Sequence, residues 1–65
     1  MIYVGYCPPA FCREAIVFVA DNVDAIPPDV LNYTRFHDDD RELAFGAARK
    51  LAQAEGVEIS YPNGL

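Results

Sequence analysis

Two proline pairs divide this chain of 65 residues and limit every element that it can form. Pro8-Pro9 and Pro27-Pro28 lack the backbone N–H groups that a strand ladder or a helix interior needs. Each proline ring also pushes the preceding residue toward extended geometry. A strand or helix therefore has to end before each pair or begin after it.

Strand patterns lie near both ends of the chain. Residues 1–6 place Ile2, Val4 and Tyr6 on one side of an extended chain, the period-two pattern of a half-buried strand. Residues 57–61, VEISY, alternate in the same way and are followed by the turn-forming Pro-Asn-Gly. We predict a strand at each place.

The stretch REAIVFVADN at residues 13–22 fits two structures. Four β-favouring residues in succession at 16–19, followed by the turn-prone pair Asp21-Asn22, indicate a strand. As a helix, the stretch would place Ala15, Phe18 and Val19 on one face, but Val17 would fall among charged residues. We favour a strand at residues 13–20, which makes the preceding cysteine segment a hairpin loop.

The clearest helix pattern covers residues 40–55. Asp39 can cap it, with Glu42 three residues on, and Gly56 suits the left-handed position after its last turn. We expect its central apolar line to consist of Leu43, Ala47, Leu51 and Ala54, widened by Ala44 and Ala48. Residues 29–36, before this helix, fit either a short helix or an extended segment.

These elements predict a single α+β domain over residues 1–65. A small sheet of two to three strands carries the C-terminal amphipathic helix on one face. A domain of this size buries only about 60% of the surface that its unfolded chain exposes, so its stability is marginal. A sheet covered on one side would also leave apolar residues at 15–20 exposed, which favours a homodimer or a protein partner.

Both cysteines lie in CPPAFC at residues 7–12, and thiol oxidoreductases usually leave two residues between their cysteines rather than four. We expect Cys7 and Cys12 to be free, reduced thiols packed at the edge of the core. A disulfide across the hairpin loop is an alternative, and it would stabilise little because the closed loop is small. If residues 11–22 were helical, the order βαβαβ would loosely resemble the thioredoxin and glutaredoxin fold. This resemblance would imply a thiol-dependent redox protein using Cys7 and Cys12.

The stretch His37-Asp38-Asp39-Asp40 contains side chains that can bind a divalent metal or act as a general base. Three successive aspartates cannot all face one point on a helix, so we interpret them as charge matched to the helix dipole. A zinc site at the cysteines would need two further ligands, and His37 is the one histidine of the chain. Since no phosphate loop or nucleophile motif is present either, we predict a protein without metal, cofactor or catalytic residues.

The whole net charge of −5 falls between Asp21 and Glu42, because the residues on either side of this stretch sum to zero. If the turns fold the stretch onto one surface, it forms an acidic patch with interleaved aromatic side chains. The predicted partner-binding residues are Asp21, Asp24, Asp29, Tyr33, Phe36, His37, Asp38, Asp39, Asp40 and Glu42.

An acidic patch repels nucleic acid and attracts a basic protein surface, although an excess of carboxylates also serves solubility alone. We therefore expect a non-catalytic protein that binds a basic surface, such as an inhibitor or accessory factor of the kind phages and mobile elements encode. The longest apolar run, residues 15–20, is too short to cross a membrane, and the N-terminus lacks a secretory pattern. These features predict a cytoplasmic protein.

Overall fold

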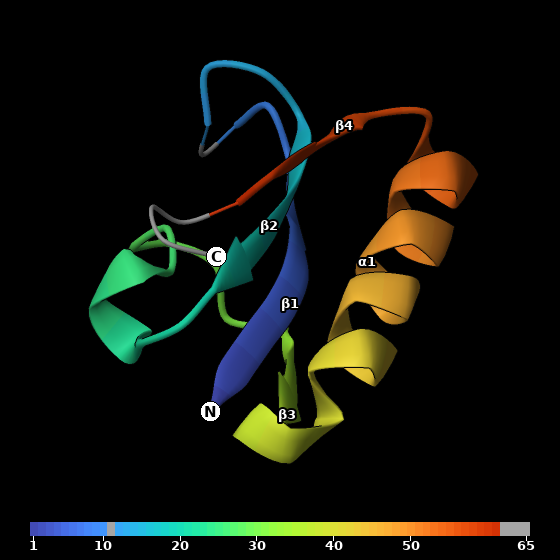
Figure 1. Ribbon diagram of the computed structural model, residues 1–65. Coiled ribbons are helices and arrows are strands. Elements are labelled where there is room, and N and C mark those ends of the chain that lie inside the picture. Colours follow the sequence, from blue (N-terminus) through green and yellow to red (C-terminus); the bar gives the residue numbers. More distant parts are fainter. Residues whose placement is uncertain (11, 62–65) are drawn as a thin grey trace.

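The structure is a computed structural model that describes residues 1–10 and 12–61. Within these residues, four strands, two short 3-10 helices and one α-helix follow each other. Figure 1 shows their arrangement. Their bounds are β1 Ile2–Cys7, β2 Ile16–Ala20, η1 Val23–Ala25, β3 Thr34–Phe36, η2 Asp38–Asp40, α1 Arg41–Glu55 and β4 Glu58–Ser60. The prediction of a small α+β fold with one C-terminal helix is confirmed.

The strands form one mixed sheet in the order β3-β1-β2-β4. β1 pairs antiparallel with both β2 and β3, whereas β2 pairs parallel with β4. β3 and β4 therefore run in the same direction at the two edges, and α1 makes the crossover connection that such a pair needs. The βαβαβ alternative is wrong, because residues 16–20 form a central strand rather than a helix.

The predicted sheet of two to three strands is too small, because the sheet has four. The missing strand is β3, whose three residues are too few to show an alternating pattern. β2 is also shorter than the predicted 13–20, because residues 13 and 14 form a bend that connects the cysteine loop to the strand. In the described residues, no helix is long and apolar enough to cross a membrane.

One face of the sheet packs against α1 (Figure 1). Its buried cluster joins the strand residues Ile2, Val4, Val17 and Val19 to the helix residues Ala44, Ala48 and Ala52. The predicted central line of the helix is therefore wrong in part, since Leu43 is 64% exposed and Ala54 is also exposed. A stripe of alanines at every fourth position lets the helix axis approach the sheet more closely than leucines would.

The predicted cap is absent at the N-terminal end of α1 and present at its C-terminal end. Asp39, the predicted cap, lies inside η2, and Asp40 at the N-cap position makes no side-chain hydrogen bond to the helix. At the C-terminal end the prediction is confirmed. Gly56 adopts a left-handed conformation with φ 68°, and its N–H donates to the Ala52 carbonyl oxygen.

The second face of the sheet is covered by the chain between β2 and β3. Cys7, Phe18, Ala20 and Val30 form a second buried cluster there, bordered by partly buried side chains such as Tyr3 and Tyr33. The expected exposed apolar face is therefore absent: residues 17–20 of β2 are all buried. A homodimer is not needed to cover this strand.

Candidate functional site

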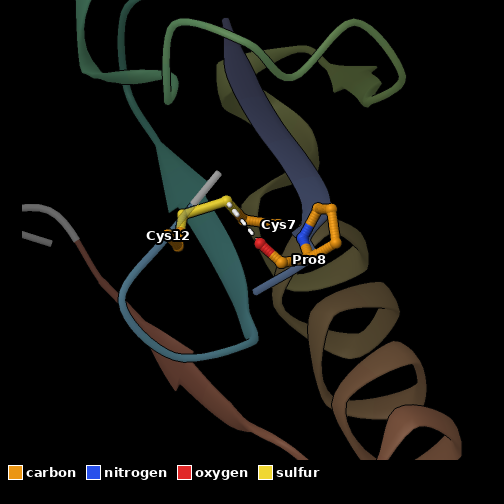
Figure 2. The surroundings of a disulfide bond; sticks show 3 residues. All are labelled: Cys7, Pro8 and Cys12. Atoms are coloured by element: carbon orange, nitrogen blue, oxygen red, sulfur yellow. Dashed lines mark hydrogen bonds between the residues drawn. A yellow bond between two sulfur atoms is a disulfide. The ribbon is translucent and has the colours of Figure 1, made fainter. Parts of the chain in front are cut away.

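A disulfide joins Cys7 to Cys12, with their Cα atoms 6.2 Å apart (Figure 2). The prediction of free, reduced thiols is therefore wrong. β1 and β2 pair up to Cys7 and Ile16, so the chain between them must turn back at once. The backbone N–H of Cys12 donates to the Pro8 carbonyl oxygen at 3.2 Å, and this tight turn brings Cys12 next to Cys7.

The two cysteines differ sharply in exposure. Cys7 is 0% exposed at the end of β1, inside the second cluster. Cys12 is half-buried in the loop, and it borders an open surface hollow of about 530 Å³ together with Arg13, Glu14 and Ile16. An outside molecule can therefore approach the disulfide from the Cys12 side.

The sulfur of Cys7 lies 3.8 Å from the Pro8 carbonyl oxygen, the dashed line in Figure 2. In the disulfide this sulfur carries no proton, so the interaction is a contact rather than a true hydrogen bond. After reduction the Cys7 thiol has a proton and can donate it to this oxygen as a weak S–H donor. The fold thus provides a partner for the buried thiol of the reduced protein.

The acidic residues gather around the N-terminal end of β1. Ile2 lies opposite Phe36 in β3, and Tyr3 lies opposite Ala20 in β2. The C-terminal ends of β3 and β2 therefore lie on either side of the N-terminus. The N-terminal amine forms an ion pair with the Asp38 carboxylate at 2.8 Å. We call this group of exposed carboxylates the acidic end; it consists of Asp21, Asp38, Asp39, Asp40 and Glu42.

The pKa of the Asp38 carboxyl is lowered from its ordinary value of 3.8. The largest cause is the hydrogen bond from the N-terminal amine, followed by the positive charge of that amine. The charges of Arg41 and His37 act in the same direction to a smaller extent. Asp38 is therefore held in its charged form by contacts that the fold creates.

Several predicted partner-binding residues lie elsewhere. Tyr33 packs into the second cluster and meets the Tyr3 ring edge-on at 5.5 Å between centroids, while Phe36 packs against the first cluster. Asp29 borders a hollow beside Tyr6, toward the opposite end of β1. Asp24 is exposed in η1, and His37 is exposed just before η2. The predicted patch is therefore not one surface, and its aromatic members mainly serve the core.

Within residues 1–10 and 12–61, no group of three or more His, Cys, Asp or Glu side chains is placed to hold a metal ion. Comparison with protein-family models, with curated proteins and with solved structures finds no match for this chain. Function has to be inferred from the acidic end and the disulfide. The acidic end was visible in the sequence as a charge run, and the disulfide as a pair of cysteines flanking a hairpin loop.

Proposed function

We propose that this chain is a small non-catalytic protein that uses its acidic end to bind a basic surface of another protein, as an inhibitor or accessory factor. The observation that carries the proposal is the placement of Asp21, Asp38, Asp39, Asp40 and Glu42 at one end of the sheet, all exposed. Among the charged side chains of the described residues, none is buried. The carboxylates of Asp39, Asp40 and Glu42 are therefore accessible to a partner's lysines and arginines, whereas Asp38 is paired with the N-terminal amine and Asp21 accepts a hydrogen bond from the Asn22 side chain.

The charge of this end favours a protein partner over nucleic acid. Nucleic-acid binding relies on lysine and arginine neutralising phosphates, and a cluster of carboxylates opposes it. Complementary charge raises the association rate and discriminates among partners. Binding should also weaken with salt, since exposed charges are screened over about 10 Å at 0.1 M ionic strength.

The chain offers a matched pair of variants for the test. Asp39→Asn with Glu42→Gln removes two charges from the acidic end, whereas Asp29→Asn with Glu58→Gln removes two charges outside it. Both double variants have the same net charge. Glu58 pairs with Ile16, at the end of β2 away from Asp21, so the control leaves the acidic end intact.

Each immobilised variant is exposed to a native lysate at low and high salt, and the retained proteins are identified by mass spectrometry. We expect a partner that the wild type and the control retain at low salt. Loss of two exposed charge pairs, about 0.2–1 kcal/mol each, should weaken its binding roughly 2-fold to 30-fold in the acidic-end variant. Equal retention by both double variants, or binding that ignores salt, would refute the proposal.

A thiol-dependent redox protein using Cys7 and Cys12 is the second candidate function, and the disulfide favours it. The two functions do not compete for space, because the cysteines and the acidic end lie at opposite ends of β1, roughly 17 Å apart at about 3.3 Å per residue. Titration of free thiols before and after treatment with millimolar glutathione tests this candidate. We expect no free thiol before and two afterwards; a disulfide that survives this treatment would count against it.

A further inference from the structure

We infer that a low-molecular-weight thiol attacks this disulfide at the sulfur of Cys12 and that Cys7 is the sulfur released. The loop residues 8–10 and 12–15 are then set free. This inference rests on the second candidate function and adds the site of attack, the class of substrate and the structural consequence. It depends on the unequal burial of the two cysteines, because Cys7 is buried and Cys12 is half-buried.

Access decides which sulfur is attacked. A thiolate must approach a disulfide sulfur directly, and the rate depends on access as well as on the leaving thiol. Cys7 is 0% exposed, and its side chain is enclosed by the second cluster. Cys12 is half-buried and borders the open hollow together with Arg13 and Glu14. A small thiol therefore has a route to Cys12 through this hollow, whereas Cys7 is closed to it.

The exchange balances without an added oxidant. The thiolate forms a bond to the Cys12 sulfur, the bond between Cys12 and Cys7 breaks, and its electron pair leaves with the Cys7 sulfur. Cys7 takes up a proton from solvent, and the resulting thiol can donate to the Pro8 carbonyl oxygen 3.8 Å away. A second thiol molecule then releases Cys12 as a thiol and leaves as the small disulfide.

The buried position of Cys7 also limits the rate of thiol–disulfide exchange at Cys12. A buried, apolar setting disfavours a thiolate, so Cys7 is a poor leaving group. Exchange at Cys12 should therefore be slower than at a fully exposed disulfide, but still faster than exchange at Cys7. The reverse step is favoured once Cys7 opens to solvent, because its thiol lies next to any mixed disulfide on Cys12.

The loop is held by few other contacts. Among residues 8–10 and 12–15, the bond from Cys12 N–H to the Pro8 oxygen is the one backbone hydrogen bond outside the strands. Cys7 itself stays anchored, because it belongs to β1 and pairs with Ile16 of β2. Reduction should therefore release the loop while the sheet remains paired.

The test begins with the oxidised wild-type protein and glutathione. The reaction is stopped by acid at short times, remaining thiols are alkylated in denaturant, and fragmentation in a mass spectrometer locates the glutathione. We expect at least about tenfold more glutathione on Cys12 than on Cys7, falling toward equal amounts when the reaction is run in concentrated urea. The variant Cys7→Ala, in which Cys12 is a free thiol, is treated with glutathione disulfide instead; it should form the mixed disulfide at Cys12 with release of glutathione thiol and should accumulate it, because the resolving thiol is gone.

Hydrogen exchange of the oxidised and reduced wild type tests the structural consequence. We expect exchange of the Cys12 amide, which donates to the Pro8 carbonyl oxygen in the oxidised protein, to accelerate at least about tenfold on reduction, with Val4 and Val19 in the paired strands little changed. Glutathione found mainly on Cys7, equal partition in the folded protein, or uniform acceleration throughout the sheet would overturn the inference while leaving a redox function possible. A disulfide that does not react with glutathione would overturn both.

Discussion

Reduction of the disulfide should lower the free energy of unfolding by about 2 kcal/mol. The bond links residues with a sequence separation of 5, and the entropy lost by the unfolded chain on closing so short a loop corresponds to this value at 25 °C. That value is small for a disulfide. It is nevertheless a large share of the roughly 3–5 kcal/mol that a core of this size supplies.

Thermal and urea unfolding followed by circular dichroism, with and without a phosphine reductant, measures this effect. In a domain of this length about 7 °C of Tm corresponds to 1 kcal/mol, so Tm should fall by about 14 °C on reduction. The variant Cys12→Ala serves as the control. It keeps the buried Cys7, should match the reduced wild type, and should not respond to the reductant.

Two outcomes would refute this reasoning. A change below about 0.5 kcal/mol would mean that the unfolded chain already holds the two cysteines together. Complete unfolding on reduction would mean that the disulfide maintains the second cluster rather than only closing a loop. The second outcome would also contradict the local opening that we infer for the reduced protein.

Three further predictions follow from individual contacts. Gly5→Ala should lower the free energy of unfolding by about 1–3 kcal/mol in urea titrations, because the added Cβ would lie 2.7 Å from the Phe18 ring. The same substitution should cost less in a Phe18→Leu background. An equal cost in the two backgrounds would exclude this clash. Gly56→Ala should lower the free energy of unfolding by about 1 kcal/mol, because residue 56 has a φ of 68°. Gly46→Ala inside α1 should raise it by about 0.5–1 kcal/mol, because the nearest atom to the added Cβ is 3.9 Å away. Changes of the same sign would contradict the left-handed cap at Gly56. Because the pKa of Asp38 is lowered in the fold, its ion pair should stabilise the protein above pH 3.8 and be lost as the pH falls through the folded pKa. Acetylation of the N-terminal amine should raise this pKa in an NMR titration, and an unchanged value would show that the amine is not the partner.

Elements whose apolar residues repeat with a regular period were predicted correctly from the sequence. The strands at both ends of the chain, the helix and its Gly56 cap each follow from periodicity or from one special backbone conformation. β3 was missed because three residues carry no period, and because its place at the edge depends on pairing with Ile2 and Val4 far away in the sequence. Local sequence does not contain that information.

The sites illustrate the same limit. The charge run predicted an acidic surface, but only the strand register shows that Asp21 and Asp38 flank the N-terminus while Asp29 lies elsewhere. Leu43 was expected to be buried because it is large and apolar, yet close approach of the helix to the sheet selects alanine instead. Free cysteines were expected from the usual redox state of cytoplasmic proteins, and the predicted cytoplasmic location stays a prediction.

The two short outer strands have a consequence for solubility. β2 has the sequence IVFVA, an apolar β-favouring segment of the kind that stacks into fibrils when its backbone is exposed. It is enclosed between β1 and β4, while the sheet edges are formed by three-residue strands with the charged side chains Arg35 and Glu58 exposed. Loss of β4 through proteolysis or truncation would expose one side of β2. β4 therefore covers the aggregation-prone backbone of β2, in addition to packing Ile59 against the first cluster.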